Sequence, residues 1–505
     1  MTWRAWITSV TTRKEWLTGL LAMLGIVLRS GHYGRNPAMW HDEAALVMNV
    51  IEKGFLQLLG PLKYAEAAPP LFLWLERGVM LTVGDGTYAL RLIPYLAGCF
   101  TVALMWAAAR RILDCEAVVW AVLLLSCSDR LLWHCCEAKP YAVDALLAMG
   151  IITLYVVSQA WSINRRILVY AVLAPIAVWI SYPGCFLYGG LLLVLLPEVW
   201  RDRRRSVRAL YALLALVVVL AFATMYLGPI RAQRHAAMDS CWVQGFPDWS
   251  RPWLLPWWFL VSTVEIVDYC LRPIGGVLAG VAVVGGVHLW RDGQRGLVTL
   301  IAAPILLAAV AAMMHAYPYT GARVMVYALP GIVILTAAGV RPVMAWLAAA
   351  GPGRGGGPAP AARVAQGLLL VLLLAPLGWS LYRTAIPWPR ADTAAASAYV
   401  LAERQGDDPV MANHWEYDYY FRRLGSAYQP LDRPENLAIP DGRVWAVITA
   451  QMAQQRADIL RGLLQNPWQV ARQRDFARTT VVLLVRAHPA TGDTGTRTGG
   501  DAVTR

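Results

Sequence analysis

The chain has 505 residues, of which 58% are hydrophobic and 15% are charged, whereas a soluble domain carries roughly 25% charged residues. This composition excludes an ordinary soluble enzyme. The net charge is +13, but the 45 basic residues include only four lysines. Because no lysine-rich arm exists to follow a phosphate backbone, no nucleic-acid partner is expected.

Long apolar runs fill the first three quarters of the chain. A bilayer core about 30 Å thick requires about 20 apolar residues per helix, since the backbone finds no water there. About eleven segments meet this requirement, and they predict a mostly α-helical, polytopic membrane protein. The predicted spans are residues 16–31, 89–109, 117–133, 140–159, 167–182, 184–200, 208–228, 273–290, 297–314, 324–347 and 364–386.

Arginines gather in every second loop between these spans. If the N-terminus is cytoplasmic, all of these loops lie on the cytoplasmic side, as the positive-inside rule requires. An odd number of spans then places the C-terminus outside, so we predict a multi-pass protein of the plasma membrane. The loop arginines are Arg110, Arg111, Arg165, Arg166, Arg201, Arg203, Arg204, Arg205, Arg208, Arg291, Arg295, Arg341, Arg354 and Arg363.

The first outer loop, residues 31–88, contains a short amphipathic pattern. Apolar residues recur at near-helical spacing after Asp42, which predicts a juxtamembrane helix lying in the membrane interface. Asp42 and Glu43 would occupy its first turn, where the helix dipole favours negative charge. Asp42 is therefore either a capping acid or a carboxylate at the mouth of a membrane cavity, able to accept a proton or bind a cation.

The second outer loop ends in a mixed polar cluster at the start of the fourth span. Glu137, Lys139 and Tyr141 place an acid, an ammonium and a phenol there. This pattern is typical either of a snorkelling ion pair or of a cluster that faces a phosphate and a sugar. Lys53, Lys63 and Lys139 all lie in these two outer loops, and a compact ammonium suits a contact to phosphate.

Aromatic residues mark two later outer loops. His315, Tyr319 and Arg323 lie in the loop before the tenth span, where tyrosines commonly form an interfacial belt. Arg323, at the start of that span, is a stronger candidate for a ligand contact than the tyrosines. The loop 229–257 is rich in tryptophan, and it is either another belt or a lid over a lipid or sugar site.

The composition changes after Pro387. Short apolar runs at 444–450 and 479–487 predict strands, and helical patterns occur around 391–405 and 451–464. We therefore predict three parts of the chain: a transmembrane domain over 1–387, a small extracytoplasmic α/β domain over 388–490, and a disordered tail over 491–505.

Neither the cysteines nor the histidines have the spacing of a metal site. The eight cysteines lack any CxxC motif and mostly suit apolar packing, with a disulfide from Cys135 or Cys136 to Cys241 as an alternative. We expect no metal, although a pair formed by Asp42 and Glu137 would be able to bind a divalent cation.

Five short motifs lie along the chain in a characteristic order. They are HDEA at 41–44, Glu66 before a double proline at 69–70, RLIPYLAG at 91–98, EAKPYAVDAL at 137–146 and ARVMVYALPG at 322–331. In order, spacing and sidedness they resemble the polytopic glycosyltransferases of the GT-C fold. Within that fold the resemblance is to the protein mannosyltransferases and the bacterial aminoarabinose transferases. It is firm over residues 1–160 and fainter over 160–350.

The resemblance implies an inverting glycosyltransferase that moves a sugar from a polyprenyl-phosphate donor to a lipid, glycan or protein acceptor on the outer face. It implies a catalytic acid at Asp42, which would deprotonate the acceptor hydroxyl, and a second acid at Glu137, which would orient the acceptor or the sugar. Glu66 is followed by alanine instead of the basic residue of the aminoarabinose transferases, which puts that substrate in doubt. The remaining candidates for substrate contacts are Glu43, Lys63, Glu66, Arg91, Lys139, Tyr141, His315, Tyr319 and Arg323.

Two other functions compete with a transferase. A transporter or flippase of a lipid-linked glycan predicts inverted repeats and helices broken at the bilayer midplane. In this chain the charges gather instead at the outer ends of the spans. An inactive scaffold would not need the intact set of acids, so the sequence favours the transferase.

Overall fold

The computed structural model describes residues 3–202, 204–235, 240–349, 359–431, 442–464 and 468–486, with side chains from residue 15 onward. The chain divides into two compact units. We call residues 1–37 and 45–388 the helical unit, and residues 38–44 and 389–505 the sheet unit. The tail predicted at 491–505 lies outside the described residues, and so does most of the Gly/Pro-rich stretch before the last predicted span.

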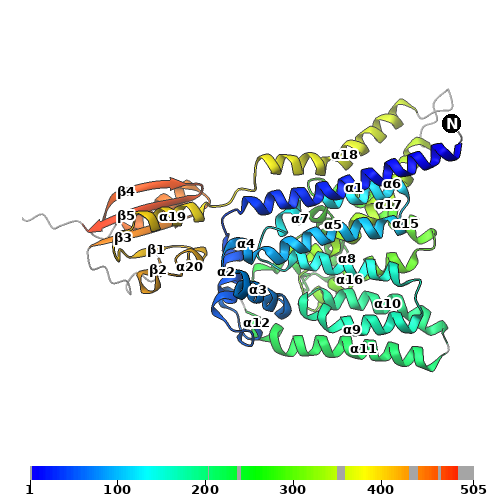
Figure 1. Ribbon diagram of the computed structural model, residues 1–505, viewed down its shortest axis with the longest axis horizontal. Coiled ribbons are helices and arrows are strands. Elements are labelled where there is room, and N and C mark those ends of the chain that lie inside the picture. Colours follow the sequence, from blue (N-terminus) through cyan, green and yellow to red (C-terminus); the bar gives the residue numbers. More distant parts are fainter. Residues whose placement is uncertain are drawn as a thin grey trace, which may run out of the picture. The chain divides into compact units, whose positions relative to one another are not determined.

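Long helices make up the helical unit, and they run roughly parallel or antiparallel to one another (Figure 1). Three shorter helices, α2 (His41–Glu52), α3 (Pro70–Val83) and α4 (Thr87–Leu90), form the connection after α1. The α2 helix begins in the sheet unit and continues into the helical unit. The others are α1 (Trp3–Arg35), α5 (Leu92–Ile112), α6 (Cys115–Ser126), α7 (Asp129–His134), α8 (Tyr141–Ser158), α9 (Ile163–Ile180), α10 (Gly184–Arg201), α11 (Arg205–Met225), α12 (Arg231–Gln233), α14 (Leu255–Cys270), α15 (Gly275–Arg291), α16 (Arg295–Met313), α17 (Leu329–Ala349) and α18 (Pro360–Ala385).

The spans differ in number from the eleven predicted. Within the described residues, eight helices are long and apolar enough to cross a membrane, or nine if α14 and α15, bent by 102°, form one span. The predicted span 16–31 lies inside α1, which is not among the eight. The predicted span 117–133 is interrupted in the structure, because Ser128 accepts a hydrogen bond from the Leu131 N–H and caps a new helix, so α6 and α7 are separate. The apolar helix α14, before the predicted span 273–290, was missed.

Two glycines allow α15 and α17 to pack with their backbones in contact. A Cβ on Gly285 would lie 1.8 Å from the Leu335 carbonyl oxygen, and a Cβ on Gly339 would lie 2.0 Å from the Val281 carbonyl oxygen. Small residues at helix crossings are the usual means of close packing in membranes, where no hydrophobic effect draws helices together. The α15–α17 pair therefore depends on the absence of side chains at these two positions.

We expect Gly285→Ala to lower the melting temperature of the purified protein, because overpacking a close contact costs about 1–3 kcal/mol. Gly280→Ala on the same helix is the matched control, since a Cβ there meets nothing within 4 Å. Thermal unfolding in detergent compares the two variants. Equal melting temperatures would contradict the contact.

The sheet unit contains a five-stranded sheet with strand order β2-β1-β3-β5-β4. β1 runs parallel to β2 and β3, whereas β5 runs antiparallel to β3 and β4. Alternate residues of β3 and β5 enter two separate apolar clusters, one shared with α19 and α20 and the other with α21. The elements are β1 (Val410–Ala412), β2 (Tyr428–Pro430), β3 (Arg443–Thr449), β4 (Trp468–Phe476), β5 (Thr479–Arg486), α19 (Thr393–Glu403), α20 (Glu416–Tyr420) and α21 (Ala453–Leu463).

The sequence identified those strands of this sheet that are covered on both faces. β3 and β5 coincide with the predicted strands, and α19 and α21 coincide with the predicted helices. β1 and β2 have only three residues each, too few for a periodic pattern. β4 is largely exposed and carries arginine and glutamine, so it lacked an apolar signal.

A histidine in the loop after β1 gives the sheet unit a pH-dependent contact. The Nδ1 atom of His414 lies 3.3 Å from a carboxylate oxygen of Glu416. Hydrogen bonding to this carboxylate raises the pKa of His414 above its ordinary value, although partial burial opposes the shift. The pair is therefore fully stabilising below the unfolded-state pKa of roughly 6.5, and its contribution is lost as the pH rises through the folded-state pKa.

We accordingly expect His414→Gln to lower the melting temperature at pH 5.5, where the imidazolium pairs with Glu416. The difference from the native protein should shrink at pH 8.5, where the ring is neutral in both the folded and unfolded states. Thermal unfolding of both proteins across this range measures the effect. A difference that is independent of pH would show that the pair carries no charge.

Candidate active site

The first turn of α2 carries both acids of the HDEA motif, in different surroundings. Glu43 is fully buried, and one of its oxygens lies 3.6 Å from the guanidinium of Arg390. The side chain of Asp42 is 16% exposed, and one of its oxygens lies 3.5 Å from Nε2 of His41. Both acids belong to the sheet unit. Asp42 thus retains solvent access, whereas Glu43 takes part in an internal ion pair.

In the helical unit, Glu137 lies at the centre of a buried hydrogen-bonded network. One carboxylate oxygen is 2.5 Å from Nδ1 of His134, and the other accepts a hydrogen bond of 2.9 Å from the indole N–H of Trp133. The Nε2 atom of His134 is 2.9 Å from the hydroxyl of Tyr269. Glu137 itself has no exposed surface. Both oxygens of this predicted catalytic acid are therefore engaged by neighbouring side chains.

The Glu137 network extends to a cation on η6, the short helix Arg323–Ala328 before α17. The guanidinium of Arg323 lies 5.8 Å from the ring centres of both Tyr141 and Trp242. The Tyr141 ring in turn lies 4.9 Å from the His134 ring. Cation–π contacts of this kind hold an arginine in place without neutralising it. The structure thus brings together three residues that the sequence singled out separately, Glu137, Tyr141 and Arg323.

A second charged pair lies beside this network along the chain. The ammonium of Lys139 is 2.8 Å from a carboxylate oxygen of Glu66, and their side chains are only 4% and 13% exposed. A backbone hydrogen bond of 2.8 Å from the Lys139 N–H to the Glu137 carbonyl closes a tight turn between the two residues. Burying an ion pair costs desolvation energy that its attraction does not reliably recover. Stability alone therefore does not explain this pair.

Other predicted contacts hold the fold locally. Arg91 is buried and donates to the Asn36 side chain and the Pro37 carbonyl, and Lys63 pairs with Glu52 near the surface. His315 stacks on Phe246, while the buried Tyr319 stacks on Phe259 and shares a hydrogen bond with Thr263. Substrate contacts by Arg91, Lys63, His315 and Tyr319 remain predictions.

Sequence reasoning missed several of the site's side chains. His134 was within reach of it, because it lies only three residues before Glu137 in the chain. Tyr269 and Arg390 had no such signal, since each meets its partner only through the fold. All eight cysteines are free thiols. Across the part of the chain that the structure describes, no group of three metal-ligating side chains is arranged to hold an ion.

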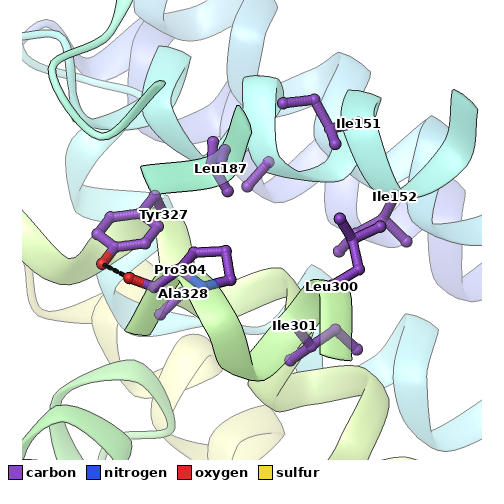
Figure 2. A pocket seen from close by; sticks show the side chains of 10 residues that line it. Ile151, Ile152, Leu187, Leu300, Ile301, Pro304, Tyr327 and Ala328 are labelled. Carbon is purple, nitrogen blue, oxygen red and sulfur yellow. Dashed lines mark hydrogen bonds between the residues drawn. The ribbon is translucent and has the colours of Figure 1, made fainter. Parts of the chain in front are cut away.

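A small cavity lies within the helical unit, lined by side chains of α8, α10, α16 and the η6–α17 segment (Figure 2). Its lining is apolar, and the Tyr327 hydroxyl that borders it already donates to the carbonyl of Pro304. The cavity measures about 10 Å³, which is room for about one water molecule. It offers neither the volume nor the polar groups that a sugar requires.

Comparison with known proteins gives one family match. Residues 67–227, about a third of the chain, match the family described as dolichyl-phosphate-mannose-protein mannosyltransferase. This segment contains Glu137, Lys139 and Tyr141. A comparison with curated proteins finds no match.

Solved structures show a likeness over nearly the whole chain. ArnT from Cupriavidus metallidurans in the apo state aligns with a TM-score of 0.52 and 15% identity, covering 92% of this chain and 98% of that one. The same protein bound to undecaprenyl phosphate aligns with a TM-score of 0.52 and 14% identity, covering 95% and 98%. The oligosaccharyltransferase of Archaeoglobus fulgidus aligns with a TM-score of 0.46 and 12% identity, covering 84% and 62%.

The family match and the two alignments with ArnT confirm the predicted fold class and the predicted resemblance. The chain is a multi-span membrane protein with a small α/β domain near its C-terminus, and it has the GT-C fold of ArnT. Over residues 67–227 it matches the protein mannosyltransferase family.

Proposed function

We propose that this protein is a membrane glycosyltransferase that moves a sugar from a polyprenyl-phosphate donor to a hydroxyl of a lipid, glycan or protein. The match to the mannosyltransferase family supports sugar transfer, and the fold shared with a protein that binds undecaprenyl phosphate supports a lipid-linked donor. The observation that carries the proposal is the buried charge within the matched segment, where Lys139 and the Glu137 network lie side by side along the chain.

The proposed chemistry is a single displacement at the anomeric carbon. The acceptor oxygen forms a bond to that carbon as the bond to the phosphate oxygen breaks, and the configuration inverts. The phosphate leaves with the bonding electrons and needs no acid, but its negative charge needs fixed cations. The acceptor hydroxyl loses its proton to a base. We assign the base to Asp42, whose side chain is partly exposed, and the cations to Lys139 and Arg323.

Glu137 has a different role from Asp42 in this proposal. The two oxygens of Glu137 face His134 and Trp133, so this carboxylate is engaged within its own network. We therefore propose that Glu137 orients the turn that carries Lys139. Glu66 would hold the ammonium of Lys139 in place until a phosphate competes for it.

The proposed reaction takes place on the outer face of the plasma membrane. The loop arginines support an N-terminus in the cytoplasm, which leaves the first outer loop and the sheet unit outside. A transporter of the same lipid-linked sugar would move its substrate without breaking the sugar–phosphate bond. Release of the polyprenyl phosphate therefore distinguishes the two functions.

We expect Asp42→Asn to reduce transfer by at least about 100-fold, because loss of a general base typically costs 10²–10⁴ in rate. The assay measures polyprenyl phosphate released from a radiolabelled lipid-linked sugar by the purified enzyme, together with the melting temperature. Glu116→Gln, which neutralises an exposed acid at the start of α6, serves as the control. Normal turnover by Asp42→Asn would contradict the assignment of Asp42 as the base.

Two exposed native cysteines report the orientation. Cys115 and Cys241 are exposed thiols, and the predicted topology puts Cys115 in the cytoplasm and Cys241 outside. A membrane-impermeant maleimide should therefore label the Cys115→Ser variant in intact cells, but the Cys241→Ser variant only after permeabilisation. The opposite pattern would invert the topology.

A further inference from the structure

The segment that carries Asp42 belongs by its contacts to the C-terminal part of the chain. Residues 38–44, which we call the Asp42 segment, form one compact unit with residues 389–505. In sequence the segment lies far from these residues, between α1 and the rest of α2. The sheet unit is therefore more than an appendage that follows the last span, because the predicted base is part of it.

Among the described residues, four side chains of the C-terminal part of the sheet unit form hydrogen bonds with the backbone of the Asp42 segment. These bonds hold the segment irrespective of its own side chains. The indole N–H of Trp415 donates to the His41 carbonyl at 2.8 Å, the Met39 N–H donates to the Tyr420 hydroxyl at 2.9 Å, Arg390 donates to the Ala38 carbonyl at 3.1 Å, and the Thr393 hydroxyl donates to the Met39 carbonyl at 3.2 Å.

The ion pair of Glu43 fixes how the first turn of α2 is rotated. Glu43 has no exposed surface, and the Arg390 side chain beside it is 9% exposed. A carboxylate buried this deeply requires its partner, because an uncompensated charge there is costly. Successive residues of a helix point about 100° apart. With Glu43 directed at Arg390, the neighbouring Asp42 is held in a different direction, where its side chain is 16% exposed.

We infer that the sheet unit is the positioning element of the transferase: Arg390, Trp415 and Tyr420 set the place and direction of Asp42 through the backbone of its segment and through Glu43. This inference rests on the proposed function, in which Asp42 is the base. Proton transfer in a transition state is sensitive to misplacement of about 1 Å, which lowers rates by up to about 100-fold. These three residues touch no reacting atom in this scheme and are positioning residues.

The double variant Trp415→Phe/Tyr420→Phe tests the inference in the full-length enzyme. It removes the indole N–H and the phenolic hydroxyl that hold His41 and Met39, and it retains both aromatic rings. We expect kcat to fall about tenfold or more while the KM for the polyprenyl-phosphate sugar stays within about twofold, because Asp42 contributes to the transition state and not to donor binding. The conservative variant Thr393→Val, which removes one hydroxyl from Met39, should show a smaller fall in kcat.

Tyr428→Phe is the matched control in the same unit. Its hydroxyl donates to Asp418 at 2.6 Å, in a hydrogen bond that does not involve the Asp42 segment. It should match the double variant in melting temperature to within a few degrees and retain the native kcat. If the double variant has a much lower melting temperature than Tyr428→Phe, the kcat of Thr393→Val alone tests the positioning role, since this variant removes one hydroxyl at constant shape.

The possible results separate the inference from the proposed function. A native kcat in both the double variant and Thr393→Val, with Asp42→Asn inactive, overturns the positioning role and leaves the base assignment intact. An equal loss of kcat in Tyr428→Phe also overturns it, since any perturbation of the sheet unit would then suffice. Full activity of Asp42→Asn removes the base assignment itself, whatever the double variant does.

Discussion

A charged side chain that is buried in a protein needs a partner, and this constraint determines how the buried charged residues of this structure are arranged. Glu43 meets Arg390, Glu137 meets His134, and Lys139 meets Glu66. In each case the partner comes from another element or turn, so the ion pair also fixes the position of the backbone that carries it. Apolar packing, which is abundant in this chain, holds the helices together but cannot direct a carboxylate or an ammonium.

Asp129 follows the same rule at the end of the last long helix. This buried acid at the start of α7 accepts hydrogen bonds from the indoles of Trp379 and Trp388 at 2.9 and 3.1 Å. The guanidinium of Arg383 lies 3.8 Å from it and packs against the rings of the same tryptophans. The α18 helix and the residues that follow it are thereby joined to the turn that leads into Glu137.

The sequence predicted well those elements that follow from apolar composition. It predicted poorly where helices are interrupted and which side chains pair with one another. Continuous hydropathy revealed most spans and the two central strands, because burial on all sides leaves an uninterrupted apolar run. The same reasoning predicted one continuous span across Ser128, whereas in the structure Ser128 caps α7 and α6 ends before it. It also grouped Asp42 with Glu43 as adjacent acids of one motif. Only the fold shows that one is enclosed beside Arg390 while the other retains solvent access.

The placement of residues 38–44 within the sheet unit also bears on how the protein is made. Asp42 emerges early from the ribosome, but the side chains that hold its segment are translated after the last long helix. Such non-local contacts form late, because the intervening chain must first be synthesised and closed into a loop. The segment that carries the proposed base therefore acquires its hydrogen-bond partners only after the C-terminal part of the chain has been synthesised.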